Sequence, residues 1–494
     1  MLFRSTFGKS VDLYDYGLAN AKTGVERYWV LYNAHVDAVR KNRTVNYAGI
    51  HHLEIEIPAN AKSIPLTNNT NFRGVIISVT NKQRKDFVLF VLHNKVTDIS
   101  IDKSCFYTLD FQDYQDLNKG NTLLIVHDEN PWVKNRIGYN YGATRYDILL
   151  LKNGRSVNSP IASYSNKESI PCCSYVKVTS KRKTFKNISF VRNEESTQKT
   201  FLLNVKNENK FELCNVNIST PYNEELYADH IIAFENCTNI VIKDVRVDNT
   251  YSKINKFGYA FTLYNIWNTK VDNIVANAPW GVFGNNNINK ATITNCKINR
   301  FDLHCYGCDY FFDNCIISSE IPIGSFMGTM SFKKCIFDRA TPCLYRYDYN
   351  SYLPFNLKFD RCVINMDNKH HWFLYLSQLS NVENERPELK QKNLPNINIH
   401  RCIVNLSEDM SSFDIIYLGK NYYQSPLYGI KDINIDEMIV NGYCEELRII
   451  TNHTITDTPV EVNIKGIKFS ENCNHRIVVN LVDNNGDEPQ LKLN

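Results

Sequence analysis

The chain has 494 residues, of which 43% are hydrophobic, and its 56 basic and 52 acidic residues leave a net charge of +4. This charge is small and the basic residues are scattered, so no nucleic-acid partner is expected. No segment approaches the roughly 18 uninterrupted apolar residues of a membrane-spanning helix, so no membrane span is expected either. The opening residues, MLFRSTFGKSVDLYDYG, lack the apolar core of a secretory signal. We therefore expect the chain to be made in the cytoplasm without a recognisable signal peptide.

An amphipathic helix is the first element that the sequence predicts. In TGVERYWVLYNAHVDAVRKN, Thr23 and Glu26 have the spacing of a capping box, which marks a helix start. Apolar residues at helical spacing then form one stripe, consisting of Val25, Trp29, Tyr32, Val36 and Val39. We expect residues 1–50 to form a cap that covers one end of the domain with this helix.

A short strand pattern then recurs along most of the chain. It reads apolar-x-apolar-x-x-Cys-x-apolar in ATITNCKI, YFFDNCII, MSFKKCIF, LKFDRCVI and INIHRCIV, with Cys296, Cys315, Cys335, Cys362 and Cys402 in the same slot. Other apolar residues fill this slot elsewhere, from Val75 in FRGVIISV and Ile99 in VTDISI to Ile467 in VNIKGIKF. Short strands repeating every 20 to 30 residues, with few helical stretches, indicate a parallel β-solenoid. The sequence thus predicts an all-β rod of about 11 to 13 coils.

The cysteines in the repeated slot are most simply a buried column of small hydrophobic side chains. Zinc is the alternative, and only Cys305-x-x-Cys308 has the spacing of metal ligands. That pair lacks a second Cys or His pair nearby, so we expect no metal site.

The repeat also divides the chain into segments. We expect the first coils over residues 51–100, beginning with LEIEIP, and the main β-helix over 188–482, followed by a polar tail over 483–494. Residues 101–187 do not fit the repeat and are expected to form an insertion. This insertion contains NPWVKNRIGYNYGATRYD, which is rich in aromatic and basic residues. Because long excursions from a solenoid often gather on its binding face, the insertion is a candidate wall of a groove.

The order VDLYDYG, amphipathic helix, LEIEIP, NFRGVIISV and repeating coils resembles the pectin-lyase-like superfamily. These are right-handed parallel β-helix proteins, and they include pectate lyases, polygalacturonases, alginate epimerases and phage tailspike depolymerases. The segments NCKINRFDLHCYGCD and PWGVFGNNN also resemble uncharacterised β-helix proteins of gut Bacteroides-type bacteria, often encoded near surface-polysaccharide genes. The resemblance covers nearly the whole chain and is one of architecture.

This resemblance implies a single-stranded right-handed parallel β-helix and a polysaccharide partner. It implies a monomer or a homotrimer that acts at the cell surface or as a component of a phage particle. No cofactor is expected, although the likeness to pectate lyases allows a calcium ion that helps bind the substrate. The N-T-D, D-D, G-H-G and R-I-K motifs of polygalacturonases are absent. This departure leaves the reaction type open.

One strand of the repeat has an unusual polar face. From residue 300 to 306 polar and apolar residues alternate, and successive side chains of a strand point to opposite faces. Phe301, Leu303 and Cys305 would share one face, and the other would carry Arg300, Asp302, His304 and Tyr306. Arginine can hold a carboxylate with two hydrogen bonds, and histidine or tyrosine can move protons. We therefore take these four residues as catalytic candidates, the structural alternative being a solvated outer face with an ion pair.

Further polar and aromatic residues fall on the corresponding strands of the central coils. Since stacked strands lie about 4.8 Å apart, these residues can form a contiguous patch. The substrate-binding candidates are His230, Tyr259, Trp280, Arg346, Asp348 and His370, together with Trp132 and Tyr141 from the insertion. The later strands, such as those in HWFLYLS and FDIIYLG, are interpreted as structural.

Two chemistries compete at this patch. A lyase acting on an acidic sugar needs a base, for which His304 or Tyr306 is suited, and a cation such as Arg300 or Arg346 to neutralise the developing anion. A glycoside hydrolase needs two carboxyl groups, and Asp302 with Glu320 or with Asp348 is the available pairing. The lyase is favoured because Arg, His and Tyr outnumber the plausible carboxylate pairs. A non-catalytic glycan-binding rod, similar to a tailspike-like adhesin, is the alternative from a different class.

Overall fold

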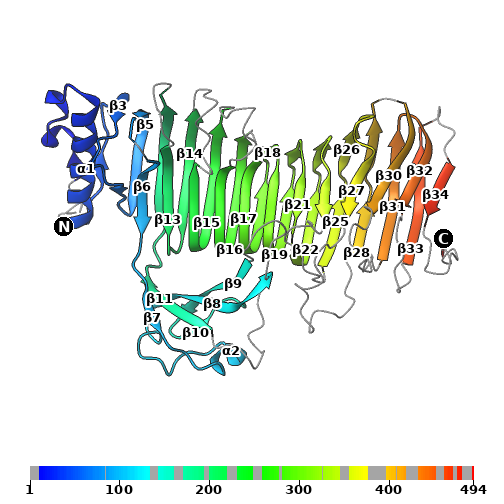
Figure 1. Cartoon of the computed structure of the whole chain (residues 1–494), viewed down its shortest axis with the longest axis horizontal. Helices are drawn as coiled ribbons and strands as arrows, with labels where there is room; N and C mark the ends of the chain where they lie inside the picture. Colours follow the sequence, from blue (N-terminus) through cyan, green and yellow to red (C-terminus); the bar gives the residue numbers. More distant parts are fainter. Residues whose placement is uncertain are drawn as a thin grey trace, which may run out of the picture.

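The computed structural model is nearly all β (Figure 1). It describes residues 10–83, 85–133, 143–160, 171–193, 200–219, 231–248, 259–276, 281–324, 326–344, 355–376, 396–407, 409–418, 432–451, 461–470, 476–480 and 492–493. Two α-helices occur in these residues, α1 (Gly24–Arg40) and α2 (Cys105–Thr108), with short 3-10 helices at Tyr14–Tyr16 and Leu18–Asn20. None of the described helices is both long and apolar enough to cross a membrane.

A 28-stranded sheet makes up the body of the molecule. Its first half consists of β3 (His52–Glu56), β4 (Ile64–Pro65), β5 (Asn69–Thr80), β6 (Phe87–His93), β12 (Lys183–Arg192), β13 (Thr200–Lys206), β14 (Phe211–Ser219), β15 (Ile232–Val247), β16 (Tyr259–Ala276), β17 (Gly281–Thr294), β18 (Lys297–Ile298), β19 (Phe301–Asp313), β20 (Ile316–Ile317) and β21 (Ile321–Ile323). Its second half consists of β22 (Phe326–Lys333), β23 (Ile336–Asp338), β24 (Pro342–Leu344), β25 (Phe355–Asp360), β26 (Val363–Met366), β27 (Trp372–Leu376), β28 (Asn396–His400), β29 (Ile403–Leu406), β30 (Met410–Leu418), β31 (Asp432–Asn441), β32 (Cys444–Thr451), β33 (Glu461–Phe469), β34 (Arg476–Asn480) and β35 (Lys492–Leu493).

The strands of this sheet stack coil upon coil along one axis (Figure 1). Each strand pairs in parallel with the equivalent strand of the next coil, so Phe261 of β16 pairs with Phe283 of β17, which pairs with Phe301 of β19. Rings of successive coils also stack, as between Phe332 and Phe359, whose centroids lie 5.2 Å apart at 8°. This arrangement confirms the predicted parallel β-helix.

A bend in each coil explains why the repeated slot is apolar. The residue directly before the slot has a left-handed backbone, with φ of 54° at Asn295 and 55° at Asn314. A polar residue such as asparagine tolerates this conformation, which turns the following side chain into the core. The slot cysteines 296, 315, 335, 362 and 402 are free and at most 2% exposed. The predicted buried column is confirmed.

Helix α1 covers the N-terminal end of the rod (Figure 1). Its capping box is confirmed, because Thr23 accepts from the Glu26 amide and the Glu26 side chain accepts from the Thr23 amide. The predicted apolar stripe is confirmed in part: Trp29 and Tyr32 pack against the core, whereas Val36 and Val39 are 38% and 44% exposed.

The buried face of α1 includes the polar aromatic residues Tyr28 and His35. His35 is fully buried, with Nδ1 3.1 Å from the Pro65 carbonyl oxygen and Nε2 2.6 Å from the Tyr47 hydroxyl. The Tyr28 hydroxyl accepts a hydrogen bond from the Lys62 amide at 3.0 Å. A polar side chain is tolerated in a core once its polar atoms have partners, so both residues pack inside the cap although they are polar.

The insertion forms a separate sheet beside the rod (Figure 1). Its strands are antiparallel, in the order β10-β9-β8-β11-β7, with bounds Thr97–Ile99 for β7, Asn121–Val133 for β8, Ala143–Lys152 for β9, Arg155–Ser156 for β10 and Cys172–Val178 for β11. The expectation that Ile99 fills a coil slot is wrong, because β7 pairs antiparallel with β11, Ile99 opposite Cys173. The β-helix continues at β12. Of the expected tail over 483–494, only residues 492–493 are described.

Candidate functional site

The outer face of β19 carries a cluster of polar side chains. Phe301 and Leu303 are 1% and 3% exposed in the core, so Arg300, Asp302 and His304 face the other way. For residues 300–304 this agrees with the predicted alternation, whereas the side chains of Cys305 and Tyr306 lie outside the described part of the structure. Tyr259, the first residue of β16, reaches the same cluster from two coils away, because β17 lies between β16 and β19.

Asp302 is the centre of the cluster and is fully buried. Its Oδ1 accepts from Arg300 Nε at 3.1 Å and lies 3.0 Å from Arg300 Nη2. Its Oδ2 accepts from the Tyr259 hydroxyl. A buried carboxylate is tolerated only where it is paired and hydrogen-bonded. The guanidinium and the phenol meet this requirement together.

His304 is joined to this carboxylate through Tyr259. Its Nε2 lies 3.1 Å from the Tyr259 hydroxyl and 3.8 Å from Asp302 Oδ2. A phenol has a single hydrogen, and since Tyr259 donates it to Asp302, the oxygen accepts from Nε2–H of His304. This assignment makes Nδ1 the unprotonated nitrogen of the neutral imidazole. The His304 side chain is 16% exposed, so the ring remains accessible in part.

Local features of the backbone place these two side chains. Opposite β19, Asn285 pairs with Leu303 and Asn286 with Cys305, so His304 is the extra residue of a β-bulge. Bulges re-aim side chains and are common beside active sites. On β17, a Cβ on Gly284 would lie 2.7 Å from two atoms of the Tyr259 ring. Glycine at this position therefore lets the phenol lie flat across β17 toward Asp302.

Arg300 holds a second carboxylate. Its Nη1 donates to Glu320 Oε2 at 3.1 Å, and the Glu320 side chain is 58% exposed whereas that of Arg300 is 11% exposed. The guanidinium thus bridges a buried and an exposed carboxylate. Both carboxylates of the pair suggested by the sequence are bound to the same arginine.

Aromatic side chains continue along the same sheet face. Leu303 pairs with Ile323, Pro322 with Cys343, Cys343 with Tyr375, and Tyr375 with Tyr417, so a single row of positions leads from Asp302 to two tyrosines. Three coil steps of about 4.8 Å separate Asp302 from Tyr375, a distance of about 14 Å.

The end of this row is an aromatic surface formed by Trp372, Tyr375 and Tyr417, which we call the aromatic row. The Tyr417 ring stacks on Trp372 at 4.8 Å and 18°, and on Tyr375 at 5.8 Å and 16°. All three side chains are half-buried. The sequence interpretation of these strands as purely structural missed this surface. The signal was present, since FLYL and IIYL place tyrosine at the same position of adjacent coils.

The remaining sequence candidates are less informative. His370 lies in a turn before β27, with Nδ1 2.6 Å from Asp367 Oδ1, and this hydrogen bond lowers the pKa of Asp367. The backbone places Trp132 in β8 and Tyr306 in β19. Outside the described residues lie His230, Trp280, Arg346, Asp348 and Tyr141.

No metal centre is evident in the described part of the chain, where no three His, Cys, Asp or Glu side chains are grouped to hold an ion. The calcium ion that the resemblance allows stays a prediction.

Comparison with solved structures identifies the fold. The tailspike gp49 of Pseudomonas phage LKA1 matches over 93% of this chain and 81% of its own, with a TM-score of 0.57 and 12% identity. The tailspike gp61 of Pseudomonas phage phi297 matches over 92% and 80%, with a TM-score of 0.55 and 12% identity. No protein-family model matches the chain, and no curated protein matches its sequence. The chain has the parallel β-helix fold that these tailspikes share.

Proposed function

We propose that this protein degrades an anionic bacterial surface polysaccharide by β-elimination, with His304 as the base. The observation that carries the proposal is the connection of a partly exposed imidazole, through the Tyr259 phenol, to a buried and arginine-paired Asp302. A base that is hydrogen-bonded to an orienting group on one accessible surface is typical of a catalytic site. The aromatic row on the same face and the fold shared with two phage tailspikes support a long glycan as the substrate.

The proposed step removes a proton from the sugar carbon beside the carboxylate. Nδ1 of His304 takes this proton, the carbon–hydrogen pair becomes the new carbon–carbon double bond, and the bond to the glycosidic oxygen breaks with its electrons. The departing oxygen then receives a proton from the imidazolium or from water. As positive charge develops on His304, Nε2–H donates to Tyr259 and Tyr259 to Asp302, which stabilises the imidazolium.

Arg300 acts in this scheme as a positioning residue. Its guanidinium is already bound to Asp302 and Glu320, and its side chain is 11% exposed. It holds the carboxylate that orients Tyr259 and His304. Neutralisation of the substrate carboxylate by Arg346, the other arginine considered from the sequence, stays a prediction, because Arg346 lies outside the described residues.

Hydrolysis is the weaker alternative. It requires two carboxyl groups that flank the scissile bond and reach the substrate. Asp302 is fully buried, and both of its oxygens accept hydrogen bonds from Arg300 and Tyr259. Glu320 is exposed, but hydrolysis would still lack the second carboxyl group, because Asp302 does not reach the substrate.

The test is turnover of a panel of acidic surface polysaccharides, followed at 235 nm and by the appearance of reducing ends. β-Elimination gives both signals, whereas hydrolysis gives reducing ends alone. We expect His304→Gln to lower the rate by about 10²- to 10⁴-fold and Tyr259→Phe by about tenfold, with binding retained. His400→Gln is the matched control, because this histidine is also paired with an aspartate, Asp360, and is not among the site candidates.

Each outcome has a definite meaning for the proposal. Reducing ends without absorbance would replace elimination by hydrolysis. Binding without either signal would overturn the enzyme and leave a glycan-binding rod, which the aromatic row would by itself explain.

A further inference from the structure

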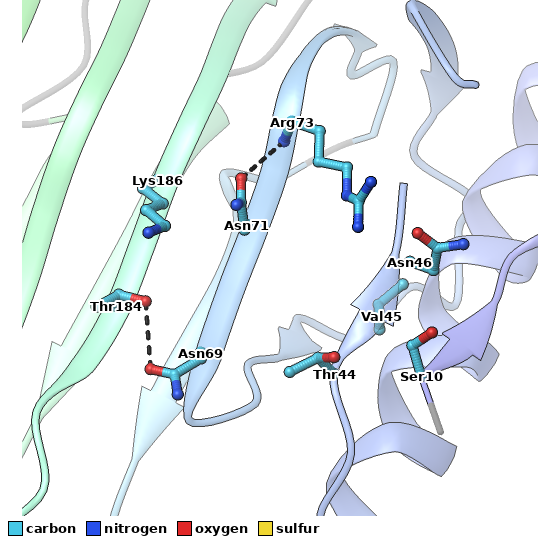
Figure 2. A pocket seen from close by; sticks show the side chains of 9 residues that line it. All are labelled: Ser10, Thr44, Val45, Asn46, Asn69, Asn71, Arg73, Thr184 and Lys186. Atoms are coloured by element: carbon cyan, nitrogen blue, oxygen red, sulfur yellow. Dashed lines mark hydrogen bonds between the residues drawn. The ribbon is translucent and has the colours of Figure 1, made fainter. Parts of the chain in front are cut away.

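A pocket of about 420 Å³ lies between the N-terminal cap and the first coils, away from the site on β19 (Figure 2). Its walls come from three segments. The strand β2 (Val45–Asn46), which pairs with β1 (Val11–Asp12), lines it from the cap, and β5 and β12 line it from the coils. The polar residues that matter here are Asn46, Asn69, Asn71, Arg73, Thr184 and Lys186.

The charge of this cap pocket is positive. Arg73 and Lys186 line it, and no aspartate or glutamate does. Neither side chain forms a hydrogen bond or an ion pair with any residue that the structure describes. Nearby basic residues differ in this respect, since Arg182 and Lys243 both bind Glu212, at 3.1 and 3.0 Å. Two cations without a protein partner thus converge on one pocket.

The amides of the pocket also present donors. Asn71 Oδ1 accepts from the Arg73 amide at 3.0 Å and from Asn187 Nδ2 at 2.9 Å, and Asn69 Oδ1 accepts from the Thr184 hydroxyl at 3.3 Å (Figure 2). Their oxygens are therefore occupied, and within the described part of the chain neither Nδ2 has an acceptor. A surface of guanidinium, ammonium and amide donors selects a ligand that offers acceptors and negative charge.

The backbone of β5 is built to expose the arginine. Lys186 pairs with Asn71 and Ile188 with Val75, so β5 has three residues where β12 has only Asn187. Phe72 stays in the core at 0% exposure, and Arg73 is turned outward with φ of 57°. Figure 2 shows its side chain reaching across the gap toward Val45 and Asn46. The extra length of β5 thus places a cation beside the bend where the next two coils carry Asn187 and Asn215.

A second hollow continues from the first. It is lined by Asn71, Arg73, Gly74, Asn187 and Asn215, and is an open depression of about 580 Å³. Asn215 donates to Asn187 at 2.8 Å, and Asn187 donates to Asn71, so a ladder of amides runs along its floor. Arg73 lies between the two hollows. A sugar whose carboxylate is bound at Arg73 can therefore place neighbouring hydroxylated rings in either hollow.

We propose that the cap pocket is a second glycan-binding site, specific for a sugar residue that carries a carboxylate. Arg73 and Lys186 bind the carboxylate, and the amides of Asn69 and Asn71 donate to ring hydroxyl and carboxylate oxygens. From β5 to β19 there are six coil steps, about 29 Å along the axis, so the cap pocket is separate from the His304 site. This proposal stands whether or not His304 is catalytic.

The test is ligand-observed NMR titration of the full chain with a glucuronic acid oligosaccharide, with a glucose oligosaccharide of equal length and with inorganic phosphate. We expect the acidic oligosaccharide to bind at low salt and the neutral one to bind about tenfold more weakly. Arg73→Asn and Lys186→Gln should each weaken binding of the acidic oligosaccharide by about tenfold. Asparagine tolerates the left-handed backbone of position 73, so this variant keeps the local fold.

Matched controls separate the two sites. Arg182→Gln removes an exposed but paired cation beside the same strand and should leave binding unchanged. His304→Gln should also leave the binding that depends on Arg73 unchanged, even where it abolishes turnover. Equal binding of the neutral oligosaccharide, equal binding of phosphate alone, or full binding by Arg73→Asn would each overturn the proposal. Loss of binding in His304→Gln but not in Arg73→Asn would assign the ligand to the β19 site instead.

Discussion

The hydroxyl of Tyr259 lies 3.1 Å from Nε2 of His304, although the two residues are 45 positions apart in the sequence. The stacking of β16, β17 and β19 brings them together, and the absence of a side chain on Gly284 leaves the path between them open. Their contact turns a buried aspartate and an accessible imidazole into one hydrogen-bonded chain.

Gly284→Ala is expected to disturb this chain by a steric effect. The added Cβ would lie 2.7 Å from the Tyr259 ring, so the ring must move. Overpacking of this kind costs about 1–3 kcal/mol of stability, and turnover should fall together with the shift of Tyr259. Thermal unfolding and turnover of Gly284→Ala check this, alone and combined with Tyr259→Ala. If Gly284→Ala destabilises the Tyr259→Ala variant as much as it destabilises the wild type, the clash does not involve the Tyr259 ring.

Arg300→Met is expected to destabilise the protein far more than Glu320→Gln. Removing the guanidinium leaves the fully buried Asp302 without its cation, which costs about 3–5 kcal/mol. The exposed Glu320 contributes at most about 1 kcal/mol. Chemical denaturation of both variants measures the difference. Adding Asp302→Leu to Arg300→Met should recover part of the loss, and similar midpoints for the two single variants would contradict the buried pairing.

Trp372→Ala and Tyr417→Ala are expected to weaken glycan binding without changing the chemical step. The two rings stack at 4.8 Å and offer an apolar face to a sugar ring. We expect KM to rise about tenfold for each variant while kcat stays within about twofold. Phe311→Ala is the control, because Phe311 is an aromatic residue that is 39% exposed and follows the left-handed residue Asp309 in β19, away from the aromatic row. An equal effect of this control would remove the special role of the aromatic row.

His35 is expected to make the cap sensitive to acid. Burial lowers the pKa of His35 to about 4 from an ordinary value of 6.5. Between these values the unfolded chain binds the proton and the folded chain does not, so the stabilising contribution is present above pH 6.5 and is lost as the pH falls toward 4. The difference corresponds to about 3 kcal/mol at most.

Melting temperatures at pH 7 and pH 5 test this effect in the wild type and in His35→Gln. The wild type should lose more stability than the variant on this change of pH, because glutamine does not titrate. An equal loss in both proteins would show that other groups control the acid response.

The parallel β-helix could be predicted because its information is local and repeated. Each coil carries its own alternation, its left-handed polar residue such as Asn295, and its apolar slot such as Cys296, and repetition reinforces a weak signal. Alternation likewise placed Arg300, Asp302 and His304 on one face. The buried face of α1 could not be predicted in this way, because His35 is buried through partners that lie on other segments.

Sequence alone therefore determined the coil, its core and the polar face of β19, since these depend on residues close together in the chain. Only the tertiary structure decided that Tyr259 joins Asp302 to His304, that Asp302 is buried, and that Trp372 and Tyr417 stack on the same face. These relationships depend on the register between coils. Turns of variable length shift that register, and the sequence of one coil does not show by how much. The pattern within a strand determines which face a side chain occupies, and the stacking of coils determines which other side chains it contacts.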